Sequence, residues 1–540
     1  MASLFCGRLR SVALVLCRWG MMVSVVAVLF VDGPMSPPSH AQSATPPGHA
    51  EDRELELTLA NAIQLAIQHN LDIEQERFGP KIARTDVETA RAEFDPVVGA
   101  EASVSQTKVL PTREEVLIDP DTGLIVATQV LKPFLKNGEL TPFLRQKVIT
   151  GGSYELRFVN TRENASPTVS GVSRTIADPR FESSLALLFT QPLLRDFGIA
   201  LNKAPIRRAE KSEAIAHQRV VQTVLNVVFQ VQERYWDMVF RLQNLEAQRE
   251  SQKLAEDFLA ENKIRVELGT LAPIELVQAE TQVKLREEDV ILAEAAVREA
   301  EDALKEVINL PEMLGSWNIR LNPSDQPTFE PITALVVEDK LREALLQRPD
   351  VIEAQLSIES REIAREEALN QRLPRLDLEA RGSLSSFGND AGEDLSDLSE
   401  INGYQWLFGL QFEYPLGNRA AQNNLSRRKL ELRQALVAQR RLMLTIVREV
   451  RQAVRGIETA SKRVEVTRAA SKLARTQLEA EQEKFRLGLS TSFRVLEFQR
   501  ELTDARSSET QALSDYNVEL GRLDLRTGKL RYVDLQTGGG

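Results

Sequence analysis

The residue types that most often carry chemistry in proteins are sparse in this sequence and do not cluster. Two of its four histidines lie near the N-terminus and the other two are isolated, at His40, His49, His69 and His217. No metal-binding group or histidine-based catalytic pair is therefore apparent, and no glycine-rich phosphate or dinucleotide motif occurs. Acidic runs such as Glu287–Asp289 belong to charged helix faces. We expect no enzyme and no cofactor.

One loop has the oxygen-rich composition of a calcium loop. The segment Asp119-Pro120-Asp121-Thr122-Gly123 lacks the regularly spaced later ligands that such loops supply. Pro, Asp and Gly in this order are typical of tight turns. The segment therefore favours a hairpin turn over a metal site.

Composition and charge exclude one class of partner. The 540-residue chain has a formal net charge of −11, with 27% charged and 6% aromatic residues. Lys and Arg are scattered among acidic residues and form no basic stripe, so we expect no nucleic acid partner. The bias toward Ala, Glu, Leu, Arg and Gln favours long helices.

The N-terminus has the pattern of a secretory signal. Arginines precede the apolar run Met21–Val31, and prolines and a small-residue site ending at Ala41 follow it. A run of about eleven residues is too short to span a bilayer as a helix. We predict a signal peptide over 1–41, whose removal takes Cys6 and Cys17 with it, and a flexible leader over 42–53.

The chain contains two related halves. Corresponding positions are Asp72 and Asp350, Pro96 and Pro374, Pro192 and Pro415, and Gly269 and Gly488. The offset is 278 for the first two pairs, 223 for the third and 219 for the last, so the first half carries about 55 extra residues within 106–180. We predict a first repeat over 54–312, a linker over 313–337, a second repeat over 338–530 and a tail over 531–540.

Long helices with a regular apolar seam follow the strands in each half. The seam steps alternate between four and three residues, which specifies a left-handed supercoil against a neighbouring helix. The first seam comprises Val224, Val228, Val231, Tyr235, Met238, Leu242 and Leu245. The second comprises Ile446, Val450, Ala453, Ile457, Ala460, Val464, Thr467, Ser471, Ala474 and Leu478. The proline-free stretch Ile206–Leu268 allows a helix of roughly 95 Å.

Short runs with period-two alternation point to a membrane. The clearest run places aromatic and aliphatic side chains on one strand face, at Tyr404, Trp406, Phe408, Leu410, Phe412 and Tyr414. Leu185, Leu187 and Phe189 form a weaker run in the first half, matched by Ala100, Ala102 and Val104. This alternation is typical of outer-membrane strands, and a soluble sandwich is the alternative.

The predicted strand count requires oligomerisation. We count two strands per half and four per chain. Sheets in lipid cannot have a free edge, and bacterial barrels need at least eight strands. Several chains must therefore share one barrel, although neither eight nor twelve strands is excluded by this reasoning.

The duplicated order of motifs resembles the TolC-like outer-membrane efflux protein family. The resemblance rests on Leu57–Ile63, Asn70–Ile73, Ala90–Pro96, the Gln-Pro-Leu and Tyr-Pro-Leu strand ends, and Arg486–Thr491, and extends from about Glu54 to Leu530. It implies a mainly helical homotrimer with a twelve-stranded barrel and a twelve-helix periplasmic tunnel. Such proteins work with a periplasmic adaptor and an inner-membrane pump in the outer membrane of Gram-negative bacteria, as tripartite efflux or type I secretion ducts.

The resemblance also assigns two regions. The helical-hairpin tips, where family members meet the adaptor, correspond to Gly269, Thr270, Leu271, Gly488, Leu489, Ser490 and Thr491. Family members often place acidic residues six and nine positions past the second glycine to narrow a closed aperture. This chain has Arg494 and Glu497 there, Glu275 six positions past the first glycine, and Phe485 where an aromatic residue commonly helps closure.

Arg494 has two interpretations. Three copies facing one axis would repel one another and attract anions. Alternatively, Arg494 pairs with Glu275 or Glu497 and lies away from the axis, which we favour. An acidic selectivity ring is therefore in doubt.

The rival functional class is an exported coiled-coil scaffold or adhesin without channel activity. It requires continuous heptads and no strand of the 404–414 kind. A passive porin is disfavoured because it requires many strands per chain and no long helices.

Overall fold

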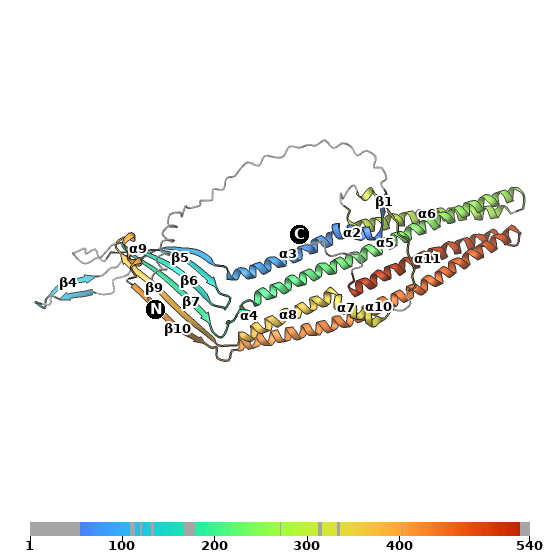
Figure 1. Ribbon diagram of the computed structural model, residues 1–540. Helices are drawn as coiled ribbons and strands as arrows, with labels where there is room; N and C mark the ends of the chain where they lie inside the picture. The colour runs from blue at the N-terminus through green and yellow to red at the C-terminus, as the bar shows by residue number, and fades with distance from the viewer. Residues whose placement is uncertain are drawn as a thin grey trace, which may run out of the picture. The chain divides into compact units, whose positions relative to one another are not determined.

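Figure 1 shows the computed structural model, which describes residues 54–108, 114–118, 121–130, 134–166, 179–270, 272–310, 316–331, 335–401 and 403–529. The predicted signal peptide, leader and C-terminal tail lie outside the described residues, as does Leu271 at the first predicted tip.

The strands of both halves join one antiparallel sheet (Figure 1). Its order is β10-β9-β7-β6-β5-β2. The bounds are β2 Val97–Lys108, β5 Phe134–Lys147, β6 Ser153–Ser166, β7 Arg180–Pro192, β9 Arg375–Gly388 and β10 Gly403–Glu413. The prediction of four strands per chain was wrong, because the insertion in the first half adds β5 and β6 to the sheet.

The rest of the insertion forms a separate two-stranded hairpin, β3 (Glu114–Ile118) and β4 (Ile125–Val130). Asp121 and Gly123 lie between these strands, and Gly123 has a φ of +66°, which suits glycine in a turn. The predicted hairpin turn is confirmed at the described positions.

Helices make up the remainder of each half. The first half contains α2 Leu59–His69, α3 Leu71–Arg91, α4 Ile199–Asn202, α5 Ala204–Glu267 and α6 Pro273–Ile308. The second contains α7 Val337–Gln347, α8 Pro349–Asn370, α9 Ala391–Ser399, α10 Arg419–Arg486 and α11 Ser492–Thr527. Short 3-10 turns are η1 Ala92–Phe94 and η2 Ser316–Asn318. Among the described residues, no helix has an apolar stretch long enough to cross a bilayer.

The predicted seams are the core of the helical part. In α5, all seam positions except Leu242 are buried, and Leu242 packs against the same cluster. In α10, every seam position except the half-buried Thr467 is buried. Small residues such as Ala453 and Ala460 lie where α10 packs on α11, which allows close approach of the two helices.

The described part of the predicted linker contains a strand, β8 (Arg320–Pro323), which pairs in parallel with β1 (Glu54–Leu57). The Asp325 carboxylate then accepts hydrogen bonds from the Leu59 amide at 2.6 Å and the Tyr235 hydroxyl at 2.9 Å. Burial is the largest cause of the raised pKa of Tyr235, so the hydroxyl keeps its proton and remains a donor. Asp325 of the linker therefore holds the start of α2 against α5.

Corresponding side chains lock the helix junctions of the two halves. Asn70, between α2 and α3, donates from Nδ2 to the Val307 carbonyl at 2.9 Å. Arg348, between α7 and α8, donates from Nη1 to the Arg526 carbonyl at 3.3 Å. These donors are 278 residues apart and the acceptors 219, which are the offsets found in the sequence. The junction contact is therefore a property of the repeat.

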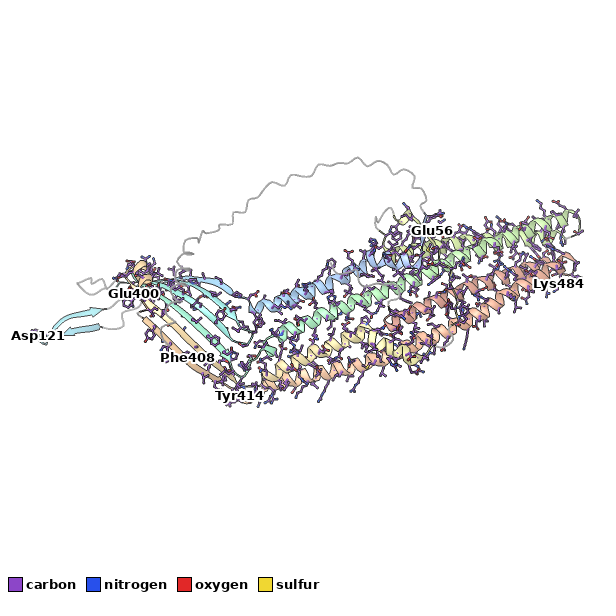
Figure 2. The ribbon with its side chains drawn as sticks, viewed as in Figure 1. Glu56, Asp121, Glu400, Phe408, Tyr414 and Lys484 are labelled. Carbon is purple, nitrogen blue, oxygen red and sulfur yellow. The ribbon has the colours of Figure 1, made fainter. Side chains whose placement is uncertain are left out.

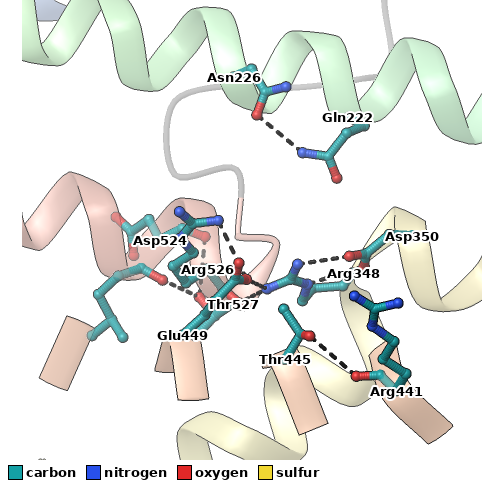
Figure 3. A network of polar contacts seen from close by, with 11 residues as sticks. Gln222, Asn226, Arg348, Asp350, Arg441, Thr445, Glu449, Asp524, Arg526 and Thr527 are labelled. Atoms are coloured by element: carbon teal, nitrogen blue, oxygen red, sulfur yellow. Dashed lines mark hydrogen bonds and ion pairs between the residues drawn. The ribbon is translucent and has the colours of Figure 1, made fainter. Parts of the chain in front are cut away.

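Arg348 extends this contact into an ion network, which Figure 3 shows. Its guanidinium binds both carboxylate oxygens of Asp350, at 3.0 and 2.7 Å, and Glu449 Oε2 at 2.9 Å. Burial opposes its charge, but the hydrogen bonds that it donates to these two acids and their negative charges outweigh that effect and raise the pKa of Arg348. Glu449 also pairs with Arg526 at 3.3 Å. Three helices, α8, α10 and α11, thus meet at one buried cation.

Replacing Arg348 with alanine removes the donor to Asp350 and the Arg526 carbonyl and leaves Glu449 with Arg526 alone. We expect the free energy of unfolding to fall by about 1–3 kcal/mol, the cost of leaving a buried polar group without its partner. Thermal unfolding of detergent-solubilised protein, followed by circular dichroism, measures the change. Arg219→Ala is the matched control, because its pair with Glu353 is 59% exposed on the arginine side and worth about 0–1 kcal/mol. Equal effects of the two substitutions would contradict the role given to Arg348.

Candidate functional site

The sheet has one apolar and one polar face. On the apolar face, one register level across all six strands holds Trp406, Gly382, Leu187, Leu156, Leu144 and Val98. Directly beside it on the more polar face, one level holds Gln405, Ser383, Ala186, Arg157, Phe143 and Gly99. The predicted apolar row of β10 is therefore continuous with the apolar face of the entire sheet.

This apolar face is uncovered in the single chain. Along β10, Tyr404, Trp406, Phe408, Leu410 and Phe412 are 65–72% exposed, and Figure 2 labels Phe408 and Tyr414 at this edge of the sheet. In the described part of the chain, the other two sheets are the β1–β8 and β3–β4 pairs, and neither packs extensively on the six-stranded sheet. A soluble sandwich would cover this face with a second sheet; the structure has no such layer there.

Helix α9 closes one end of the apolar band. Its Asp394 is 2% exposed and accepts hydrogen bonds from Ser183 of β7 and Ser386 of β9, at 2.5 and 2.6 Å. These two serines are paired in register, and each lies two residues beyond an apolar pair, because Ser183 precedes Leu185 in β7 and Ser386 follows Leu384 in β9. Polar side chains and a buried carboxylate therefore mark where the apolar band ends.

The sheet has two edges, β2 and β10. Each has a neighbouring strand on one side only, so along the other side its backbone N–H and C=O groups have no strand partner among the described residues. β10 is also the strand with the most exposed aromatic side chains. Such an edge is unsuited to water and, unless it is paired, to lipid.

The hairpin tips have equivalent backbone geometry. Gly269 and Gly488 both adopt positive φ, at 71° and 75°. Thr270 N donates to Arg265 O and Leu489 N to Lys484 O, each reaching back five residues. These bonds form the glycine-terminated helix end that the sequence predicted at both breaks.

The two tips are held together by residues that precede them. Asn262 donates to Ser492 Oγ at 3.3 Å, and the Arg265 guanidinium lies 4.6 Å from the centre of the Phe485 ring. Phe485 is only 4% exposed and packs on Phe258, with ring centres 5.2 Å apart. In the single chain, Phe485 therefore joins the hairpins and is not on the surface.

The charged gate candidates are dispersed. Arg494 is exposed, and no ion pair joins it to Glu275 or Glu497 among the described residues. Glu275 is half-buried, and one of its carboxylate oxygens is buried with no hydrogen-bond partner in the described part of the chain. Glu497 lines a groove of about 330 Å³ between α6 and α11, together with Gln278 and Phe493.

Sequence reasoning missed one residue of the second tip. Glu481 is 4% exposed and accepts hydrogen bonds from Ser490 Oγ at 2.5 Å and Lys484 Nζ at 2.9 Å. The hydrogen bond from Ser490 is the largest cause of its lowered pKa, followed by that from Lys484, and Arg494 contributes electrostatically. The sequence feature that could have indicated this contact is Glu481, nine residues before Ser490, which follows the break at Gly488. Within the described residues no group of metal-binding side chains occurs.

Known proteins share this architecture. The family described as "Outer membrane efflux protein" matches residues 182–310 and 341–529, more than half of the chain. Outer membrane protein TolC of Vibrio cholerae is 24% identical over 335 residues, which cover 61% of this chain and 73% of that protein. The outer-membrane channel OprN is similar in structure, with a TM-score of 0.62, 13% identity, and 88% and 91% of the two chains covered. The Campylobacter jejuni CmeC outer membrane channel gives a TM-score of 0.60 at 15% identity over 92% and 93%.

Replacing Ser490 with alanine should loosen the second tip. Because the pKa of Glu481 is lowered, its stabilising contribution is present above the ordinary glutamate value of 4.5 and is lost as the pH falls through the lower folded value. Hydrogen exchange with mass spectrometry should show faster exchange of peptides covering 486–492 in Ser490→Ala than in wild type at pH 7. We expect that difference to persist at pH 4.5 and to vanish at more acidic pH.

The first tip provides an internal control, since Thr270 donates to a backbone carbonyl and not to a carboxylate. Peptides covering 262–275 should exchange equally in both chains. An unchanged second tip in Ser490→Ala would refute the role of the Glu481 contact.

Proposed function

This chain belongs to the outer membrane efflux protein family, and from that membership we propose that it is the outer-membrane duct of a tripartite efflux or type I secretion system. It is an efflux channel of the outer membrane that extends into the periplasm, a transport protein and not an enzyme. In the proposed role, three copies form one duct that conducts substrates passively from a periplasmic adaptor and an inner-membrane pump to the exterior.

This proposal rests on the uncovered apolar face of the sheet and on its two free edges. A coiled-coil scaffold has no use for a 65–72% exposed row of aromatic and aliphatic side chains on β10. Outer-membrane hydrocarbon is the environment that suits this row, and the polar opposite face suits a water-filled lumen. The free edges then require other copies of the chain, because unpaired backbone groups in lipid cost several kcal/mol each.

The long hairpins support the same assembly. Exposed apolar residues remain along α10, such as Leu444, Val466 and Leu473, each at least 64% exposed in the single chain. They extend along much of this 68-residue helix, from Leu430 to Leu473. Neighbouring copies of the hairpins supply the partners that would cover them.

We assign adaptor docking to the hairpin tips. The groove between α6 and α11 near the tips combines amide and hydroxyl side chains on α6 with Phe493 on α11, which is 63% exposed. An exposed aromatic residue beside polar groups is the composition of a protein-binding surface. The groove lies close to the glycine turns that end the hairpins.

We assign the aperture to the same end of the hairpins. Arg494 is exposed in the first turn of α11, and Glu275 lies at the start of α6 with a carboxylate oxygen that has no partner among the described residues. In a trimer these two positions would provide three cations and three anions close to the tips. A ring of mixed charge, and not an acidic ring, is therefore proposed for this chain.

An export assay in the native bacterium tests the function. Deletion of the gene should raise accumulation of a fluorescent efflux dye at least about two-fold, and the wild-type gene should reverse it. Phe493→Asp should form an SDS-resistant trimer in the outer membrane yet fail to restore export, since it places a charge in the docking groove. Trp317→Asp is the matched control, an exposed aromatic residue in η2 away from the tips, and should restore export. A soluble periplasmic monomer would contradict the proposed function outright.

Charge reversal at Arg494 tests its place in the aperture. In planar bilayers, Arg494→Asp should shift the reversal potential in a salt gradient toward cation selectivity, because three cations near the axis become three anions. Arg486→Asp is the control, since Arg486 is an equally exposed arginine of the tip that pairs locally with Glu483. Unchanged selectivity and conductance in Arg494→Asp would mean that this residue does not line the pore.

A further inference from the structure

Strands β5 and β6 come from the insertion in the first half and are fully integrated in the sheet. β2 pairs with β5 along its whole length, from Val97 to Lys108. β6 pairs with β7 from Ser153 to Glu163. The inserted hairpin therefore separates two strands, β2 and β7, that would otherwise be neighbours.

The apolar face runs across the inserted strands without a break. Leu144 of β5 and Leu156 of β6 lie at the same register level as Trp406 of β10. Leu156 is 38% exposed, and Val98 of β2, which pairs with Leu144 of β5, is 80% exposed. If the β5–β6 hairpin stood in water above the membrane, its residues at the level of Trp406 would be expected to be polar.

The polar face continues across the same two strands. Arg157 of β6 is at the level of Gln405 of β10, and it pairs with Glu155 at 2.9 Å. Arg145 of β5 lies opposite Glu155. Over Ser153–Phe158, β6 therefore alternates between an apolar side and a polar side, as the predicted membrane strands do. β5 follows this pattern at Leu144 and Arg145, but its Phe143 lies on the charged side, opposite Arg157. The charged side of these strands requires water.

Backbone pairing gives an independent reason to keep β5 and β6 in the bilayer. In the structure, the β5-facing side of β2 and the β6-facing side of β7 are paired with the inserted strands and not with each other, at the depth where Val98 and Leu187 are exposed to the surroundings. If β5 and β6 lay outside the bilayer, β2 and β7 would have to abandon this pairing and pair with each other to avoid open edges in hydrocarbon.

We propose that β5 and β6 are membrane-spanning wall strands, so that three copies of this chain close a barrel of 18 strands and not of twelve. This inference rests on the proposed trimeric duct. Six strands per chain leave β2 and β10 running in opposite directions, so β10 of one copy meets β2 of the next in antiparallel pairing. Barrel diameter grows roughly linearly with strand number, which gives a wall about 1.5-fold wider than twelve strands allow. The outer-membrane end of this duct therefore passes bulkier hydrated cargo than a twelve-stranded barrel would.

Lipid-quenching of single cysteine labels tests the placement of β6 in the full-length trimer. The exported chain has no cysteine of its own once the predicted signal peptide is removed, so one cysteine labelled with bimane is introduced at Leu156 or Trp406 on the apolar face, or at Arg157 or Gln405 on the polar face. The trimer is reconstituted in vesicles with nitroxide-bearing acyl chains. We expect at least a two-fold loss of fluorescence at Leu156→Cys and Trp406→Cys, and little change at Arg157→Cys and Gln405→Cys.

The four positions test the 18-stranded wall separately from the proposed duct. Quenching at Trp406→Cys without quenching at Leu156→Cys would overturn the 18-stranded wall and leave the duct intact. Equal quenching at Arg157→Cys and Leu156→Cys would also overturn it, because a wall strand has water on one side. Absence of quenching at both apolar positions would reject the membrane sheet itself and, with it, the proposed function.

Discussion

Backbone groups within a membrane have no water to bind, and this constraint determines how the chain must assemble. Its sheet satisfies every inner strand but ends at β2 and β10, each with one unpaired side. In the hydrocarbon region, both edges need partners, and the partners available to a homotrimer are the edges of identical copies. The single chain is therefore an incomplete wall. The exposed apolar residues on α10 likewise need neighbouring copies to cover them.

The same constraint explains how the two halves diverged. Their helix junctions have stayed equivalent, with Asn70 and Arg348 donating to carbonyls at the matching positions Val307 and Arg526. A change in strand number in one half is tolerated only if it leaves the flanking strand directions unchanged. Inserting a pair of strands does this, because β2 still leads away from α3 and β7 still returns toward α5. The insertion thus widens the wall without disturbing the hairpins.

Much of this fold could be predicted from the sequence, because its strongest signals are local. The seams of α5 and α10, the glycine tips and the apolar row of β10 each depend on spacing within one element. Strands β5 and β6 were missed because Gly138, Pro142 and the polar run at 160–164 interrupt their alternation. Their placement depends on cross-strand pairing, which spacing along one strand does not encode. The tip residues were found by position, whereas the burial of Phe485 and the contact of Ser490 with Glu481 depend on how the hairpins meet.

Copies of this chain are proposed to close a common wall through β10 and β2, with all six strands of each copy in the bilayer. Electron cryomicroscopy of the protein in lipid nanodiscs tests this assembly most directly, because the strands of the barrel can be counted and traced to their chains. We expect a trimer with 18 strands, in which each β10 is hydrogen-bonded to β2 of a neighbouring copy. A twelve-stranded barrel with β5 and β6 outside the lipid, or a sheet that closes within one chain, would contradict it.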